Sequence, residues 1–203
     1  MYEKPTCQVA TILWIAIFKL VQFVLMGVFV VFISDFRKKN GMVPLVNKKV
    51  TKLLKFSYFG PLIICSYTIA IMEYLSYLDF VALALTFLGA IVVAKSKLDL
   101  GICHTWAGYC KRSSELEVSG IYAYIRHPLY TGIHLFSVGQ LITLAVHAQW
   151  YLTLVAVIMG LLMISFLTIV ASKETDYLTK NLGEHFIRYK EQVHPFLPLK
   201  KYS

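Results

Sequence analysis

Five apolar runs, separated by polar and basic segments, constrain this chain more than any other feature of its sequence. The runs cover roughly residues 9–34, 56–78, 80–94, 128–146 and 150–171. A helix that crosses a bilayer needs about 20 predominantly apolar residues. The composition agrees with that use, because 58% of the 203 residues are hydrophobic, 15% are charged, and the mean hydropathy is +0.64. The sequence therefore predicts an all-α, polytopic membrane protein with about five transmembrane helices.

The spans and the segments between them account for the whole length, so we expect residues 1–203 to form a single integral membrane domain. The first run is predicted to be a retained span. It is too long for the apolar part of a signal peptide, and the residues before it carry Lys4 beside Glu3 and no small-residue cleavage site.

The charged residues predict the orientation of the spans. The 20 Lys and Arg outnumber the 11 Asp and Glu, which gives a net charge of +9. These basic residues lie in blocks between apolar runs, a pattern that argues against a nucleic-acid-binding face. With five spans, eighteen of them fall on one side, Lys4 falls on the other, and Lys19 lies inside the first run. The positive-inside rule then places the N-terminus outside and the C-terminus in the cytosol.

Two other features have mainly structural interpretations. Lys19 lies within the first span, where a charge is costly, so we expect it to pair with Glu73 or Asp79 or to extend toward the surface. The four cysteines show no paired spacing, and we therefore predict neither a metal site nor a disulfide framework.

Two polar segments, residues 98–127 and residues 172–203, are richer than the connections require. Both are cytosolic in the predicted orientation, and they meet if the last two spans form a helical hairpin. The sequence thus predicts a composite site at this membrane face. A polar ligand would reach it from the cytosol, and a lipid-soluble one would arrive sideways between helices.

The first of these segments ends in Arg126 and His127, directly before Pro128 opens the fourth apolar run. Proline suits the first position of a helix, whose N-terminus offers backbone donors to a carboxylate or a phosphate. The same residues also suit a membrane-interface anchor, with Arg126 on lipid headgroups and Tyr122 and Tyr130 in an aromatic belt. Spacing alone favours the anchor.

The second segment has the apolar stripe of an amphipathic helix. Its members recur at steps of three and four residues: Leu178, Leu182, Phe186, Tyr189 and Val193. This pattern is typical of a helix that lies on the membrane surface. Glu174 precedes the stripe and has two interpretations, a residue favoured by the helix dipole or a ligand for an ammonium group.

Together these motifs resemble the isoprenylcysteine carboxyl methyltransferase family of membrane methyltransferases. The resemblance covers about residues 99–198 and includes DLG at 99–101, SGIYAYIRHPLYTG at 119–132, Glu174, and FIRYKEQVHPFLP at 186–198. It implies an integral enzyme that holds S-adenosyl-L-methionine between the segment before the fourth span and the C-terminal tail. It also implies a lipid bilayer and a lipophilic substrate as partners, and no nucleic acid.

The resemblance assigns cofactor binding to nine positions of this sequence: Glu115, Leu116, Glu117, Tyr122, His127, Pro128, Leu129, Tyr130 and Glu174. We expect Glu174 to take the ammonium group of the cofactor. The chain departs from the family pattern at three positions. Tyr109 replaces a usual glutamine, Val170 replaces an arginine linked to the substrate, and Thr175 replaces a second glutamate.

The favoured methyl acceptor is the carboxylate of a prenylated cysteine, with another lipid or a small hydrophobic molecule as the alternative. A carboxylate needs no base, whereas an amine or a hydroxyl would require one such as His127 or His104. Two other classes remain open at this point. An NADPH-dependent, sterol-type reductase shares a similar C-terminal region, and a non-enzymatic membrane subunit would explain the missing arginine.

Overall fold

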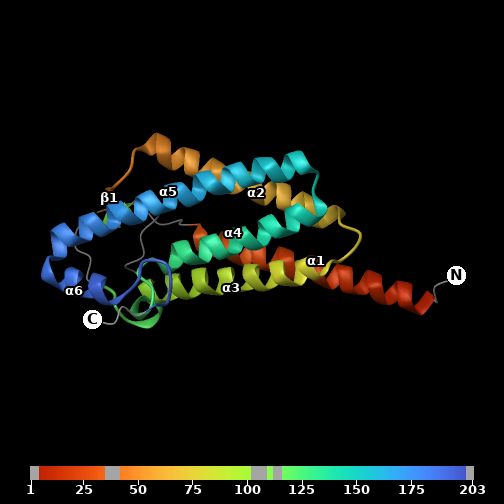
Figure 1. Cartoon of the computed structure of the whole chain (residues 1–203), viewed down its shortest axis with the longest axis horizontal. Helices are drawn as coiled ribbons and strands as arrows, with labels where there is room; N and C mark the ends of the chain where they lie inside the picture. The colour runs from red at the N-terminus through yellow and green to blue at the C-terminus, as the bar shows by residue number, and fades with distance from the viewer. Residues whose placement is uncertain (1–4, 35–41, 102–108, 112–115, 200–203) are drawn as a thin grey trace.

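The computed structural model describes residues 5–34, 42–101, 109–111 and 116–199, which form an elongated bundle of helices (Figure 1). The helices are α1 (Pro5–Ile33), α2 (Lys48–Ile71), α3 (Tyr77–Leu100), α4 (Pro128–His147), α5 (Trp150–Leu182) and α6 (Glu184–Gln192). A 3-10 turn, η2 (Gly120–Ala123), precedes α4. The predicted all-α fold is confirmed. An antiparallel pair of short strands, β1 (Met42–Pro44) and β2 (Tyr109–Lys111), joins two connections in a way that the sequence did not indicate.

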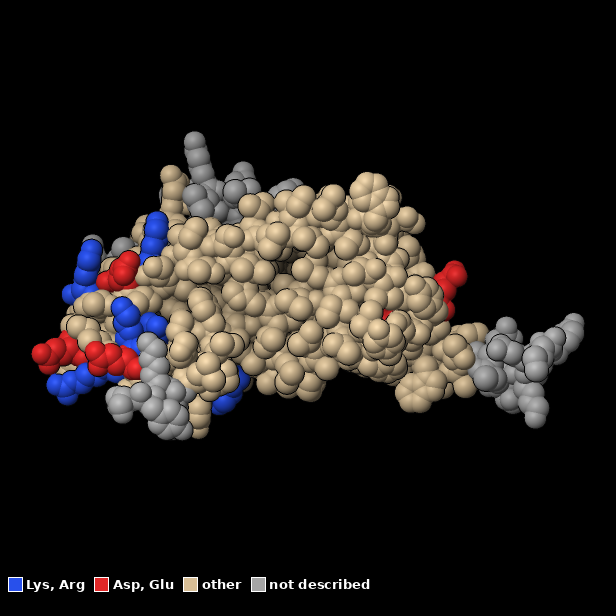
Figure 2. Space-filling view, in the orientation of Figure 1, with Lys and Arg blue, Asp and Glu red and all other residues tan. Residues whose placement is uncertain are grey.

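The bundle has the length and the surface of an integral membrane protein. Within the described residues, α1, α3, α4 and α5 are each long and apolar enough to cross a bilayer. Helix α2 has a shorter apolar part, Ser57–Ile71, and contains Pro61. Figure 2 shows that the side chains along the middle of the bundle are uncharged, while Lys, Arg, Asp and Glu gather at the ends. The lipid bilayer is therefore the environment of these helices.

Several helix boundaries differ from the expected spans, among them both ends of α2 and the C-terminus of α3, which extends to Leu100. The connection after α2 comprises residues 72–76, and Asp79 belongs to the first turn of α3, where it forms a capping box with Ser76. At the other end of the chain, α5 continues well past residue 171 and stops at Gly183, which has φ +56°. No earlier residue breaks the helix, so the fifth span and the first part of the predicted amphipathic helix are one continuous rod.

Helices α3 and α4 pack closely because glycines face each other across their interface. A Cβ atom on Gly89 would lie 2.7 Å from the carbonyl oxygen of Gly132, and one on Gly139 would lie 2.6 Å from that of Ala82. Small residues allow membrane helices to approach in this way. The pair forms a firm support for the loop that connects the two helices.

A polar cluster lies in the interior of the bundle and joins four helices. The amide nitrogen of Gln140 donates to Gln22 Oε1 at 3.2 Å and to Thr86 Oγ1 at 3.1 Å. The Cys65 thiol donates to the amide oxygen of Gln140. These four side chains are buried, and α1, α2, α3 and α4 contribute one each. Hydrogen bonds of this kind fix how membrane helices pack.

Lys19 does not use either of its expected acidic partners. Its Nζ atom donates to the backbone oxygen of Ala70, at 2.9 Å, near the C-terminus of α2. Glu73 is exposed, and Asp79 instead accepts from His147 Nε2 at 3.0 Å with both side chains buried. The structural interpretation of Lys19 is supported, because the last carbonyl groups of a helix are natural partners for a cation.

The two ends of the bundle differ in their chemistry. At one end, which we call the polar end, the C-terminus of α3, the N-terminus of α4, the last turns of α5 and helix α6 come together (Figure 1). Most of the charged side chains visible in Figure 2 lie there. The N-terminal part of α1 extends past the opposite end.

Candidate functional site

The two polar segments predicted to be neighbours do meet at the polar end. The backbone nitrogens of Arg126 and His127 donate to the carbonyl oxygens of His194 and Pro195, each at 2.9 Å. One turn into α4, Thr131 Oγ1 donates to the carbonyl oxygen of Phe196 at 3.0 Å. The C-terminal tail is thus bonded along the segment that opens α4, and it closes one side of the candidate site.

Asp99 holds the loop before α4 in place. Its Oδ2 atom accepts from the backbone nitrogen of Ile121 at 2.8 Å, and its Oδ1 atom pairs with Lys95 Nζ at 2.6 Å. Gly120 precedes Ile121 with φ +56°, and a Cβ atom there would lie 2.6 Å from the carboxyl carbon of Asp99. The DLG and SGIY motifs are therefore in direct contact. The Asp99 carboxylate occupies the space that a side chain at position 120 would fill, so this position requires a glycine.

Tyr122 connects this loop to both α3 and α6. Its hydroxyl group lies 3.2 Å from Ser96 Oγ, and its carbonyl oxygen accepts from the Tyr189 hydroxyl at 2.7 Å. Burial raises the pKa of Tyr122 to about 12, and burial also raises the pKa of Tyr189. Both phenols are therefore neutral hydrogen-bonding groups across the physiological pH range.

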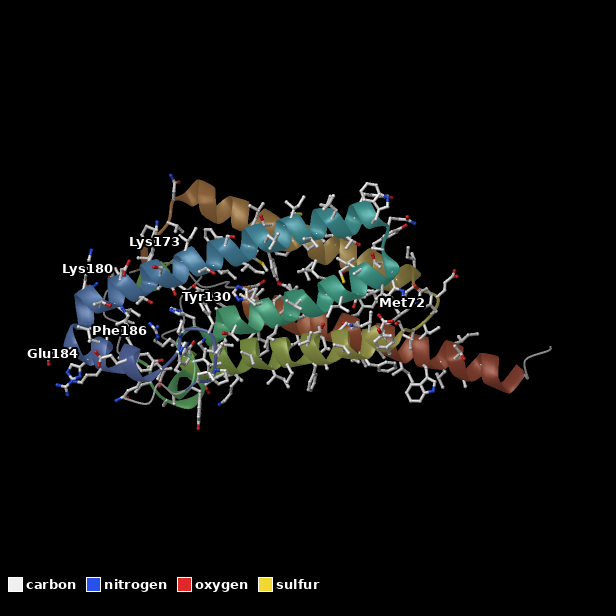
Figure 3. All side chains as sticks on the ribbon, viewed as in Figure 1. Met72, Tyr130, Lys173, Lys180, Glu184 and Phe186 are labelled. Carbon is white, nitrogen blue, oxygen red and sulfur yellow. The ribbon has the colours of Figure 1, made fainter. Side chains whose placement is uncertain are left out.

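A polar cluster of α4 and α5 side chains, which we call the Glu174 cluster, forms the chemical centre of the polar end. The Tyr130 hydroxyl donates to Glu174 Oε1 at 2.6 Å, and His127 Nδ1 lies 3.5 Å from Glu174 Oε2. His127 Nε2 lies 3.3 Å from Thr175 Oγ1. The rings of His127 and Tyr130 stack with centroids 5.6 Å apart. Figure 3 labels Tyr130 at the start of α4, beside the returning tail.

The Glu174 carboxylate has no strong cationic partner. Its side chain is 14% exposed, and that of His127 is 8% exposed. Among the described residues, no Lys or Arg forms an ion pair with Glu174. A largely buried carboxylate is costly unless a positive charge compensates it. The cluster is therefore suited to a cationic ligand. A search of the same residues finds no group of three metal-ligating side chains.

The structure describes eight of the nine predicted site residues and distributes them over three places. Glu174, His127 and Tyr130 form the cluster, with Pro128 at the first position of α4 and Leu129 packed against the apolar core. Tyr122 faces Ser96 on α3. Leu116 packs against the apolar cluster of α6, Glu117 accepts from Ser119 N at 2.9 Å, and Glu115 lies outside the described residues.

The start of α4 has fewer free donors than its sequence indicated. The backbone nitrogens of Tyr130 and Thr131 both donate to the carbonyl oxygen of His127, at 3.1 Å. Arg126 points into the protein, where its Nε atom donates to the carbonyl oxygen of Val193 at 2.9 Å, and burial lowers the pKa of its guanidinium group. The observed bonds of this turn run to the tail and within the turn itself. The turn fastens the tail.

The apolar stripe of the tail also packs inside the protein. Phe186, Tyr189 and Val193 are buried, and Leu178, Leu182 and Leu116 pack against them. The periodicity correctly predicted helices, but the stripe is covered by protein rather than by lipid headgroups.

His134 is a polar residue of this region that the sequence analysis missed. It lies one turn beyond Tyr130 on α4, and its ring centroid is 6.0 Å from that of Phe196 in the tail. Its Nε2 atom is buried and has no hydrogen-bond partner among the described residues. A histidine within an apolar run was the available signal, since polar side chains in a membrane span are expensive and often functional.

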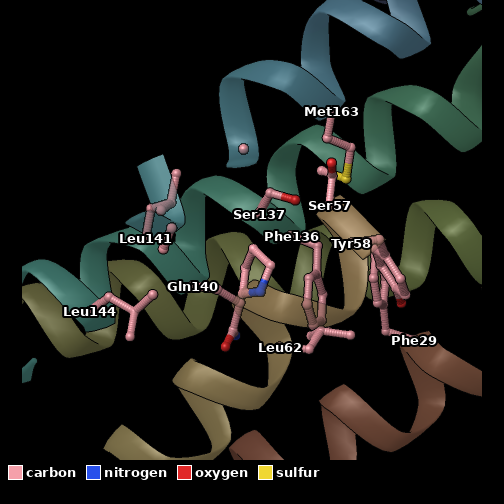
Figure 4. A pocket seen from close by; sticks show the side chains of 13 residues that line it. Phe29, Ser57, Tyr58, Leu62, Phe136, Ser137, Gln140, Leu141, Leu144 and Met163 are labelled. Atoms are coloured by element: carbon pink, nitrogen blue, oxygen red, sulfur yellow. The ribbon is translucent and has the colours of Figure 1, made fainter. Parts of the chain in front are cut away.

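An apolar cavity lies deeper in the bundle, between α2, α4 and α5 (Figure 4). Its volume is about 30 Å³, enough for roughly two water molecules. Phe29, Phe136, Leu144 and Met163 line it together with Gln140 and other residues. The cavity is too small for a nucleotide-sized cofactor, so the Glu174 cluster is the better candidate for the functional site.

A comparison with protein families identifies the chain. A family model described as phospholipid methyltransferase matches residues 78–184, just over half of the sequence. The chain belongs to the phospholipid methyltransferase family. The resemblance to isoprenylcysteine carboxyl methyltransferases pointed to the same group of membrane methyltransferases. No curated protein matches the chain.

The match to the phospholipid methyltransferase family covers the parts that build the candidate site. It begins at the start of α3, includes η2 and α4, and ends where α6 begins. Tyr122, His127, Tyr130 and Glu174 all lie within it. The tail that closes the site lies outside the matched residues. The protein is a membrane methyltransferase, and the Glu174 cluster is the place in it that suits a positively charged ligand.

Proposed function

We propose that this membrane methyltransferase uses S-adenosyl-L-methionine and that the Glu174 cluster binds it. The observation that carries the proposal is the Glu174 carboxylate, which is largely buried, accepts from Tyr130, and has no Lys or Arg partner among the described residues. The cofactor has an ammonium group and a sulfonium group, and either cation would compensate this charge. When bound, it supplies an electrophilic methyl group.

The residues of the chain then have to bind the cofactor, orient it and exclude water. Glu174 binds the ammonium group, and Tyr130 holds the carboxylate in position through its 2.6 Å hydrogen bond. His127 stacks on Tyr130 and limits the access of water, as does the tail beside it. In-line methyl transfer depends mainly on alignment and on the exclusion of water, so an acid-base triad is unnecessary. Glu115, Leu116, Glu117, Tyr122, Pro128 and Leu129 remain proposed contacts on the strength of the family resemblance.

We place this site at the cytosolic face, with the N-terminus outside, and treat the whole chain as one domain. The sequence supports that orientation, because with five spans eighteen of the 20 basic residues fall on one side of the membrane. S-adenosyl-L-methionine is made in the cytosol, which is consistent with a site on that side.

The acceptor we propose is a lipophilic molecule that reaches the site from the bilayer. The sequence favoured the carboxylate of a prenylated cysteine. Val170, one turn before Glu174 on α5, is completely buried, and no Lys or Arg occurs in α4 or in α5 before Lys173. A carboxylate would find no cation on α4 or on the part of α5 that precedes Lys173. We therefore place a lipid with an amine head group, the kind of acceptor that the family's name suggests, ahead of the prenylated cysteine.

Binding of S-adenosylhomocysteine to the purified protein tests the cofactor assignment. Calorimetry should show saturable binding of this product and none of NADPH, which a reductase would bind. The change Glu174→Ala should weaken binding about 10- to 150-fold, since a hydrogen bond to a charged group contributes roughly 1.5–3 kcal/mol. Asp176→Ala is the matched control, because Asp176 is exposed on the same helix. Equal affinities for wild type and Glu174→Ala would refute the assignment.

A further inference from the structure

His134 is a polar group of the polar end that the fold itself leaves unused. Its Nε2 atom is buried without a hydrogen-bond partner among the described residues. A buried polar atom without a partner loses free energy of the order of 1–3 kcal/mol, so such atoms are uncommon in native proteins. The neighbouring His127 is different, because its two ring nitrogens already face Glu174 and Thr175.

The register between α4 and α5 places His134 next to the Glu174 cluster. Two contacts define this register. Tyr130 bonds to Glu174, and a Cβ atom on Gly160 would lie 3.5 Å from Leu141 Cδ1. Because the two helices run in opposite directions, His134 lies level with the turn of α5 that contains Val170. Val170 lies one helical turn, about 5.4 Å, deeper in the membrane than Glu174.

The residues around His134 indicate a methyl acceptor that has a proton to give up. Val170 is apolar and fully buried, and the covering residue from the tail is Phe196, whose ring is uncharged. The titratable groups of the Glu174 cluster, Tyr130, His127 and Glu174, are engaged with one another. His134 is therefore the free proton acceptor on the bilayer side of the cluster.

We propose that His134 binds the nucleophilic head of the methyl acceptor and removes its proton. The proposal rests on methyl transfer at the Glu174 cluster. A protonated lipid amine gives one proton to His134 Nε2, in the tautomer whose other proton is on Nδ1. The freed nitrogen lone pair then forms the new N–C bond to the methyl carbon, while the C–S bond breaks and its electron pair stays on sulfur. A base at this position serves the lipid amine already proposed as acceptor, whereas a carboxylate has no proton to remove.

The first test measures activity and cofactor binding together. Wild type, His134→Gln and the control His185→Gln, an exposed histidine on α6, are placed in nanodiscs that contain phosphatidylethanolamine as the amine probe. His134→Gln should bind S-adenosylhomocysteine within about twofold of wild type. Its kcat should fall by about 100- to 10,000-fold, the range that general-base catalysis supplies. The acidic limb of the pH profile should disappear.

The second test reads His134 itself in the cofactor-free protein. With ¹⁵N-labelled histidine, the His134 resonances are assigned by their absence from His134→Gln. The Nε2 signal should move when phosphatidylethanolamine replaces phosphatidylcholine, whose head group has no N–H.

The outcomes separate the two proposals. If wild type fails to bind S-adenosylhomocysteine, the proposed function is refuted. If binding is intact while His134→Gln keeps its kcat and its pH profile, the role of His134 is refuted. An Nε2 signal that is the same in both lipids would also refute it, as would methylation of a prenylcysteine carboxylate that is equally fast in both proteins.

Discussion

Replacing Gly120 by alanine should destabilise the protein through two separate effects. Gly120 has φ +56°, a backbone conformation that side chains disfavour, and a Cβ atom at this position would lie 2.6 Å from the carboxyl carbon of Asp99. The Asp99 carboxylate is held in this position by Lys95 at 2.6 Å and by the backbone of Ile121 at 2.8 Å. In Gly120→Ala the Asp99 side chain has to rotate, and its hydrogen bond from the backbone nitrogen of Ile121 is lost.

The size of each effect follows from the structure. An unfavourable backbone conformation costs about 1–3 kcal/mol. The steric overlap with Asp99 and the loss of its hydrogen bond add to this cost, and this part is specific to Gly120. Gly183 offers a matched control, since it also has φ +56° but has no atom within 4 Å of its Cβ position. Gly183→Ala should therefore show the backbone effect alone.

Thermal unfolding in detergent, followed by tryptophan fluorescence, measures the difference between the two variants. A chain of this size loses about 2–4 °C of Tm for each kcal/mol, so the Tm of Gly120→Ala should lie measurably below that of Gly183→Ala. Equal Tm values for the two variants would refute the reasoning, because they would show that Asp99 does not pack against Gly120. Gly120→Ala should also weaken S-adenosylhomocysteine binding, whereas Gly183→Ala should not.

Two further predictions concern the bundle and its pH dependence. Gly89→Ala should destabilise the protein by about 1–3 kcal/mol, because its Cβ atom would meet the backbone of Gly132 at 2.7 Å and backbone atoms cannot rotate away. Gly27→Ala, which has nothing within 4 Å, should leave the Tm near that of wild type, and a similar loss in both variants would contradict the packing argument. Burial raises the pKa of Tyr122 to about 12 from the ordinary value of 10.0, so the folded protein keeps a proton that the unfolded chain releases. Its contribution, about 2–3 kcal/mol, is complete below pH 10 and is lost as the pH rises toward 12, so that Tyr122→Phe should flatten the alkaline decline of Tm relative to wild type.

Several features of the candidate site could be predicted from sequence because they depend on the resemblance of short motifs. The stretch around His127 and Tyr130, together with Glu174 much later in the chain, was assigned to one site, and the structure brings these three side chains together. Tyr122 was assigned to the same site, yet its hydroxyl faces Ser96 on α3. A motif gives the order of residues along the chain, and it does not specify the direction in which each side chain points.

The sequence by itself determined the membrane class and the main helices. Length, hydropathy and charge are properties of continuous segments, so the apolar runs predicted α1, α3, α4 and α5 without knowledge of any contact. Two spans separate residues 98–127 from the tail, and both segments carry blocks of basic residues. These two features likewise predicted that the segments lie at the same end. The backbone bonds between Arg126 and His194 bear this out.

Only the tertiary structure decided which polar groups meet. Lys19 bonds to the Ala70 carbonyl although two acidic residues were equally plausible partners, and the unpartnered Nε2 atom of His134 became visible only once the helices were packed. Hydropathy fixes how far a helix extends but leaves its rotation and its register undetermined. In this protein those two quantities depend on facing glycines on α3 and α4 and on contacts such as the hydrogen bond between Tyr130 and Glu174, which join residues far apart in the chain.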